Sequence, residues 1–161
     1  MATPAASELL ARAARCYRNA GHADDACRCL ERAGDHAAAA LLHEQNGRHR
    51  AAAACFERAQ SWGAAARCHQ RAGDMDDAIR CLETAGRPLE AAWLLAHHAR
   101  RPDRALALAA HPPAAMPGDS AAVALIRARC HAARRPAEAA ALLRGAAAPS
   151  PACRPDRTAS A

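Results

Sequence analysis

The chain has 161 residues and a formal net charge of +6, and 52% of its residues are hydrophobic although only 2% are aromatic. This length suits one ordinary domain or a short repeat array. Alanine makes up about a third of the chain, whereas valine and isoleucine are nearly absent. Because alanine favours helices and β-branched residues favour strands, the composition excludes a strand-rich fold and predicts an all-α protein.

The positive charge is confined to the last part of the sequence. Residues 1–98 hold 12 arginines and 12 acidic residues, whereas residues 99–161 hold 10 arginines and 4 acidic residues. The first part therefore has no basic excess to offer a polyanion. Lysine is absent, and together with the alanine excess this is typical of a GC-rich bacterial genome rather than of phosphate binding.

Nothing in the sequence suggests secretion or a membrane span. The N-terminal stretch MATPAASELL lacks the basic and apolar regions of a signal peptide, and there is no run of about 18 apolar residues. We therefore expect a cytoplasmic protein without membrane association. In a reducing cytoplasm the eight cysteines should be free thiols.

Similar residues recur every 13 positions through the first 98 residues. One position holds cysteine or leucine, at Cys16, Cys29, Leu42, Cys55, Cys68, Cys81 and Leu94. A second position is always alanine, at Ala13, Ala26, Ala39, Ala52, Ala65, Ala78 and Ala91. A third is glycine at Gly21, Gly34, Gly47, Gly73 and Gly86, with Gln60 and Ala99 in the other two units. Seven units in phase indicate a repeat fold.

Each unit predicts one short helix with an apolar face. In the second unit the apolar residues lie three or four positions apart, at Ala26, Cys29, Leu30 and Ala33. Asp24 occupies the expected N-cap position, and Gly34 occupies the left-handed position that ends a helix. A helix of about ten residues is marginally stable alone. Each helix must therefore pack against its neighbours, and the short turns make these neighbours antiparallel.

The units alternate between a constant and a variable helix. The second, fourth and sixth units carry the similar sequences CLERA, CFERA and CLETA. The first, third, fifth and seventh units carry the more varied sequences CYRNAG, LHEQNG, CHQRAG and LLAHHA. The repeat is therefore a 26-residue helical hairpin in which one helix is constant and the other is variable.

Beyond this region the 13-residue phase slips, but the helical pattern continues. We expect helices near 103–110, from about Ser120 to Ala133, and from Pro136 to about Arg144. The predicted organisation is a helical repeat array at 1–110, a Pro-rich break at 111–118, a helical hairpin continuing the array at 119–145 and a disordered tail at 146–161. The expected fold is an all-α solenoid of about ten short helices.

The pattern Ala-x-x-Cys/Leu-aromatic/Leu-x-x-Ala-Gly, followed closely by Asp, resembles the tetratricopeptide-like helical repeats. The matching residues are Ala26, Cys29, Leu30, Ala33, Gly34, Asp35, Ala65, Cys68, Ala72, Gly73 and Asp74. The likeness covers about residues 9–110 and, less closely, 120–145, with a 26-residue unit in place of the usual 34. The resemblance implies a superhelical scaffold that binds other proteins and performs no catalysis.

Residues that could carry chemistry have simpler explanations in packing and capping. Cysteine interchanges with leucine in the repeat, which favours a packing role, and the Cys-x-x-Cys pair that zinc would favour is absent. The sequence contains neither a lysine-bearing phosphate loop nor a Gly-x-Ser-x-Gly nucleophile elbow. We therefore expect no enzyme, no metal site and no cofactor.

The variable helices carry the residues expected to bind a partner. These are Tyr17, Arg18, His43, Asn46, Arg67, His69, Gln70, Arg71 and Trp93. His43 and His69 should stack along the array, either half-buried between helices or as a polar row facing a groove. Varied polar residues backed by constant apolar ones are typical of a repeat scaffold that presents a surface, and plain solvated surface is the alternative.

We predict a non-enzymatic scaffold or adaptor that binds a protein or peptide, and self-association or a larger assembly is also compatible with the pattern. The alternative is a helical-repeat nucleic-acid-binding protein, whose affinity would fall steeply with salt. It would use the basic C-terminal residues Arg100, Arg101, Arg104, Arg127, Arg129, Arg134 and Arg135. A third interpretation is an inert structural spacer.

Overall fold

The computed structural model describes residues 4–98, 101–110, 119–132 and 135–147. Every regular element in these residues is an α-helix, so the all-α fold is confirmed. The ten helices are α1 (Pro4–Asn19), α2 (Ala23–Ala33), α3 (His36–Gln45), α4 (His49–Arg58), α5 (Trp62–Ala72), α6 (Met75–Thr84), α7 (Pro88–His97), α8 (Pro102–Ala110), α9 (Asp119–His131) and α10 (Pro136–Ala147).

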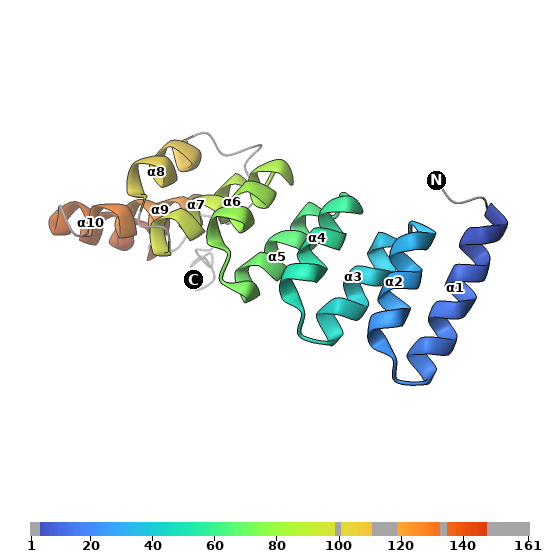
Figure 1. The fold of residues 1–161 in the computed structure, drawn as a ribbon. Coiled ribbons are helices and arrows are strands. Elements are labelled where there is room, and N and C mark those ends of the chain that lie inside the picture. Colours follow the sequence, from blue (N-terminus) through green and yellow to red (C-terminus); the bar gives the residue numbers. More distant parts are fainter. Residues whose placement is uncertain (1–3, 99–100, 111–118, 133–134, 148–161) are drawn as a thin grey trace, which may run out of the picture.

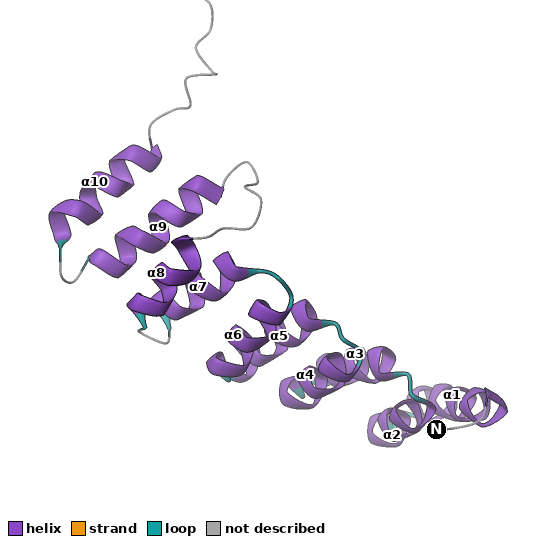
Figure 2. Cartoon of the chain, turned by 90° about the horizontal axis from the view of Figure 1, so that it is seen from above, coloured by secondary structure: helices purple, strands orange, loops and turns teal. Residues whose placement is uncertain are grey.

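Consecutive helices form antiparallel hairpins that stack in a row, with α1 at one end and α10 at the other (Figure 1). Seen from above, α1, α3 and α5 lie along one side of the row, and α2, α4 and α6 lie along the other (Figure 2). In this view α4 is nearly end-on, whereas α9 and α10 are seen lengthwise. The helix direction therefore turns along the row, as expected for a superhelical solenoid.

The alanine row forms the closest-packed part of the core. Six of its members are fully buried, namely Ala26, Ala39, Ala52, Ala65, Ala78 and Ala91. The residue after each of them is also buried, at Cys27, Ala40, Ala53, Ala66, Ile79 and Ala92. The sequence pattern predicted one apolar face per helix, but each helix has two, because it contacts both its hairpin partner and a neighbouring hairpin.

The cysteine and leucine row is buried in the middle of the array but not at its start. Its members Leu42, Cys55, Cys68, Cys81 and Leu94 are at most 8% exposed. In contrast, Cys16 is exposed and Cys29 is half-buried. Both lie in the first hairpin, where no hairpin among the described residues packs before α1. Their side chains therefore lack the cover that their equivalents receive.

The helices end where the repeat places its glycines. Gly34 has φ 82° in the left-handed region, and its N–H donates to the last carbonyls of α2, as the sequence predicted. Gly73 closes α5 in the same way with φ 83°. Gln60 occupies the equivalent position after α4 with φ 55°. A side chain is rarely found in this conformation, because its Cβ crowds the backbone.

One predicted cap is wrong. The N-cap of α2 is His22, and Asp24 lies inside the first turn of that helix. The chain needs only a two-residue turn after Asn19, so α2 begins earlier than the acidic residues suggested. Asp24 still favours the helix, because its charge lies near the positive end of the helix dipole and pairs with Arg48.

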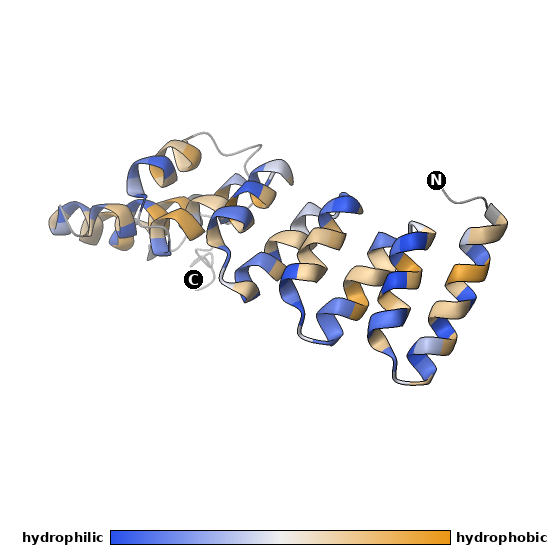
Figure 3. Cartoon of the chain, viewed as in Figure 1, coloured by the Kyte–Doolittle hydropathy of each residue, from blue (hydrophilic) through white to orange (hydrophobic). Residues whose placement is uncertain are grey.

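The C-terminal helices begin close to the predicted positions, but α10 continues three residues past Arg144 to Ala147. The predicted break at 111–118 and most of the predicted tail, residues 148–161, lie outside the described residues. Hydrophilic residues gather at the turns between the first helices (Figure 3). Among the described helices, none is long and apolar enough to cross a membrane.

Candidate functional site

One row of exposed side chains follows the odd-numbered helices. Arg15, Leu41, Arg67 and Trp93 occupy the same position of α1, α3, α5 and α7, 26 residues apart. Each follows the buried alanine pair of its helix, so the helical turn directs it away from the core. Leu41 is 53% exposed and Trp93 is 42% exposed, which is unusual for such large apolar side chains. We call these four residues the odd-helix row.

A hollow of about 280 Å³ lies between α1 and α3 beside the odd-helix row. Its lining includes Arg15, Arg18, Leu30, Asp35, Leu41 and Gln45. The lining combines apolar groups with two guanidinium groups and one carboxylate. It can therefore accept a side chain that carries both an apolar part and a charge.

Further polar contacts stabilise the same face. Arg71 of α5 forms an ion pair with Glu44 of α3, which links two adjacent odd-numbered helices. In α7, the rings of Trp93 and His97 stack with their centroids 3.8 Å apart. The Nδ1 atom of His97 lies 3.0 Å from the backbone oxygen of Trp93. The indole is thus held against the helix surface while one of its faces is exposed.

The predicted binding residues fall into two groups. The exposed group comprises Tyr17, Arg18, Asn46, Arg67, Arg71 and Trp93, and Gln70 is half-buried. The second group consists of His43 and His69, which are only 8% and 9% exposed. The two histidines therefore lie between helices rather than in a row facing solvent.

Each buried histidine belongs to a three-residue cluster that joins three consecutive helices. In the second cluster, Nε2 of His69 lies 2.8 Å from Oε1 of Glu57, and Sγ of Cys81 lies 3.4 Å from the same oxygen. The first cluster has the same arrangement. His43 Nε2 lies 3.2 Å, and Cys55 Sγ lies 3.8 Å, from Oε1 of Glu31. We call the two sets the Glu-His-Cys clusters.

Electrostatics in the second cluster show which groups are ionised. Burial alone would raise the pKa of Glu57, but hydrogen bonds from His69 and Cys81 and the charge of Arg80 together lower it. Glu57 is therefore a carboxylate, and His69 must donate its Nε2 proton to it. Burial, reinforced by the hydrogen bond to Glu57, raises the pKa of Cys81 to about 11, so its sulfur remains a thiol.

The sequence-based interpretation identified the histidines and cysteines but not their acidic partners. Glu31 and Glu57 were assigned to the constant helix surface, where they were expected to form only local ion pairs. A signal was nevertheless present. Glutamate, histidine and cysteine are spaced by 12 residues in each cluster, and the whole set recurs after 26 residues. Such spacing places the three side chains at one level of three consecutive helices.

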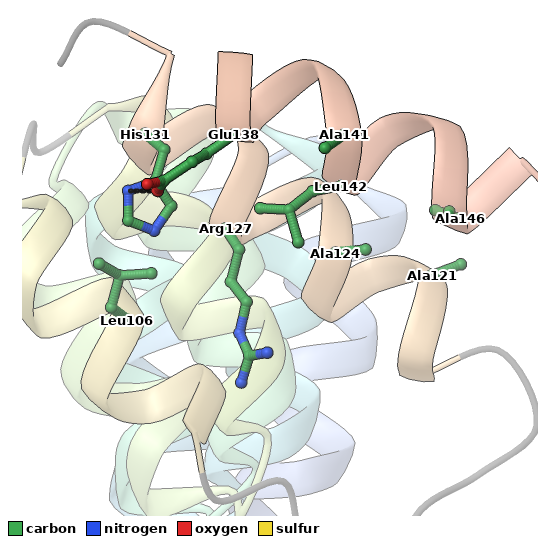
Figure 4. A pocket seen from close by; sticks show the side chains of 10 residues that line it. Leu106, Ala121, Ala124, Arg127, His131, Glu138, Ala141, Leu142 and Ala146 are labelled. Carbon is green, nitrogen blue, oxygen red and sulfur yellow. Dashed lines mark ion pairs between the residues drawn. The ribbon is translucent and has the colours of Figure 1, made fainter. Parts of the chain in front are cut away.

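A larger hollow of about 1150 Å³ lies among the last three helices. Its lining includes Leu106 of α8, together with Arg127, His131, Glu138 and Leu142 of α9 and α10. Figure 4 shows His131 and Glu138 pointing toward each other, with 4.0 Å between Nδ1 and Oε2. Alanines form much of the remaining wall, so the hollow is open and largely apolar.

Several arginines of the basic C-terminal third already have acidic partners. Arg101 lies 3.7 Å from Asp76, and Arg104 donates two hydrogen bonds to Glu83. Arg135 contacts Glu138 at 3.2 Å. These contacts neutralise part of the positive charge that a nucleic-acid-binding protein would need for phosphate groups.

The stacked hairpins define an α-solenoid, a class of repeat protein whose helices present an extended surface. Residues 36–62 and residues 61–90 each match a family model described as a tetratricopeptide repeat. The chain is therefore a tetratricopeptide-like repeat protein, as the resemblance implied. No curated protein and no solved structure matches the chain. Proteins built from these repeats generally mediate protein–protein interactions.

Proposed function

We propose that the protein is a non-enzymatic scaffold that binds an extended segment of another protein along its odd-helix row. The observation that carries this proposal is the exposure of Leu41 and Trp93 at equivalent positions of α3 and α7. Exposed leucine and tryptophan on a regular face favour an interface, because large aromatic side chains supply much of the binding energy in protein complexes.

The order of residues in the row specifies the chemistry of the partner. Arg15, Leu41, Arg67 and Trp93 alternate between a guanidinium group and an apolar side chain. A segment that alternates acidic and apolar side chains would complement this row along its length. The free thiols of all seven described cysteines support a reducing cytoplasm as the place of this interaction.

Selection from a displayed peptide library against the full chain would test the proposal. Peptides enriched in acidic and apolar residues are expected, and their affinity should fall at least tenfold in a Leu41→Ala/Trp93→Ala variant. Arg67→Ala should weaken the same peptides, with a greater effect at low salt. Fluorescence anisotropy with the selected peptides would measure these changes.

Two exposed residues outside the row provide matched controls. Arg28 lies on the surface of α2, and Leu143 of α10 is 45% exposed. Arg28→Ala and Leu143→Ala should leave peptide affinity within about twofold. Selected peptides whose binding is insensitive to the row variants but lost in Leu143→Ala would assign the interface to the C-terminal hollow instead.

A further inference from the structure

The two Glu-His-Cys clusters bring three different metal-ligating atoms to one point between helices. In each cluster the carboxylate oxygen, the imidazole nitrogen and the thiol sulfur all lie within 4.8 Å of one another. The members come from three consecutive helices, α2, α3 and α4 in the first cluster and α4, α5 and α6 in the second. The stacked repeat, rather than a local loop, thus creates both sites.

The spacing of these atoms suits a tetrahedral zinc ion. Zinc bonds of about 2.0–2.3 Å to oxygen, nitrogen and sulfur place neighbouring ligands about 3.3–3.7 Å apart. The separations from Glu31 Oε1 are 3.2 Å to His43 Nε2 and 3.8 Å to Cys55 Sγ. Small side-chain rotations would therefore be enough to direct all three atoms at one ion.

The surroundings are closed on the protein side and open at the carboxylate. The side chains of His43 and His69 are 10% and 11% exposed, whereas those of Glu31 and Glu57 are 34% and 25% exposed. The Nδ1 atoms of both histidines are buried without a hydrogen-bond partner. An ion could enter past the carboxylate, and the buried imidazole and thiol would then complete its coordination.

The charges nearby partly oppose a cation. Arg58 lies 3.8 Å from Oε2 of Glu31, which leaves Oε1 to the cluster. Arg80 lies 3.3 Å from Oε1 of Glu57, but it also donates a hydrogen bond to Asp77 and can remain there. A carboxylate and a thiolate together neutralise a divalent ion, provided that the ion displaces the thiol proton.

From these observations we propose that each Glu-His-Cys cluster binds one zinc ion, through Oε1 of Glu31 or Glu57, Nε2 of His43 or His69 and Sγ of Cys55 or Cys81. The mixed oxygen, nitrogen and sulfur ligand set suits zinc, a metal of intermediate softness. Three protein ligands leave a fourth tetrahedral position for water. The ions would then connect α2 to α6 through two coordination centres.

The next hairpin shows what happens when the ligand set is incomplete. Glu83 is the equivalent of Glu57, but the residue 12 positions later is the fully buried Leu95. Glu83 instead accepts two hydrogen bonds from Arg104, at 2.7 and 2.8 Å. The glutamate therefore belongs to the general repeat pattern, and the histidine and cysteine distinguish the two proposed sites.

Cobalt(II) titration of the reduced, chelator-treated full chain would test the proposal. Binding should produce a thiolate-to-cobalt charge-transfer band and visible bands typical of a tetrahedral site, saturating at two ions per chain. Added zinc should remove these bands. Cys55→Ser or Cys81→Ser should each reduce the stoichiometry to one, and the double variant should bind no cobalt. Zinc should raise the melting temperature of the wild-type protein but not that of the double variant.

Cys68→Ser is the matched control, because Cys68 is 1% exposed and belongs to neither cluster. It should still bind two cobalt ions. If the double serine variant fails to fold, as judged by circular dichroism, His43→Gln/His69→Gln replaces it. Absence of the charge-transfer band in the wild-type protein, or its persistence in a folded double variant, would overturn the proposal. The clusters would then be hydrogen-bond networks alone.

Discussion

Nε2 of His69 and Oε1 of Glu57 lie 2.8 Å apart and join α5 to α4. The equivalent pair, His43 and Glu31, joins α3 to α2 at 3.2 Å. Each contact links the variable helix of one hairpin to the constant helix of the hairpin before it. Polar contacts between hairpins thus repeat with the same period as the apolar core.

The carboxylate of Glu57 should stabilise the fold only where it is ionised. Its pKa is lowered in the folded protein, so its contribution is present above the ordinary glutamate pKa and is lost as pH falls through the folded value. Glu57→Gln should cost about 1–3 kcal/mol near neutral pH. Below about pH 4 the difference from wild type should shrink. Urea unfolding with a chelator present would measure it, and a constant difference down to pH 3 would contradict this assignment.

Enlarging the alanine row should force hairpins apart. Ala65 is fully buried between neighbouring helices, so Ala65→Leu should destabilise the fold by about 1–3 kcal/mol. Ala54→Leu is the control, since Ala54 is exposed on α4 and should change the free energy of unfolding by at most about 0.5 kcal/mol. Chemical denaturation of both variants would compare them. Equal effects would show that the alanine row does not set the spacing between helices.

The residues that close the helices allow a reciprocal test. Gln60 and Gly73 occupy the same repeat position with positive φ angles of 55° and 83°. Gln60→Gly should stabilise the protein by about 1 kcal/mol, because it removes a side chain from the left-handed region. Gly73→Ala should destabilise it by a similar amount through backbone strain alone, since a Cβ there would meet nothing within 4 Å. Thermal unfolding would show opposite shifts, and shifts of the same sign would contradict this explanation.

Thiol reactivity should follow position along the array. Cys16 is exposed and should react rapidly with iodoacetamide, whereas Cys81 is fully buried and burial raises its pKa to about 11. Cys55 and Cys68 are also buried with raised pKa values, so they should react slowly. Mass spectrometry of timed samples would give the order. Early labelling of Cys81 would indicate that the hairpins separate readily in solution.

Much of the fold was predictable, because the 13-residue period constrains every unit in the same way. The buried alanine row and the closing role of Gly34 were both visible in the sequence. The second buried position, which includes Cys27 and Ile79, was missed. It depends on contacts between hairpins, and a pattern read along one helix shows only one apolar face.

The candidate site was less predictable for the same reason. Trp93 and Arg67 were identified as exposed residues of the variable helices, but the row also includes Arg15 and Leu41. His43 was expected either between helices or facing a groove, and only the packing of α2 against α3 and α4 distinguishes these positions. Contacts across helices depend on how hairpins stack, which no single helix specifies.

The ion pairs that join hairpins connect residues close together in the sequence. Arg50 and Asp74 are 24 positions apart, Arg104 and Glu83 are 21 apart, and Arg71 and Glu44 are 27 apart. Few long chain loops must close before such contacts form, so the entropic barrier to folding is small. Folding can therefore proceed progressively from the N-terminus during translation, with each new hairpin using its predecessor as a template.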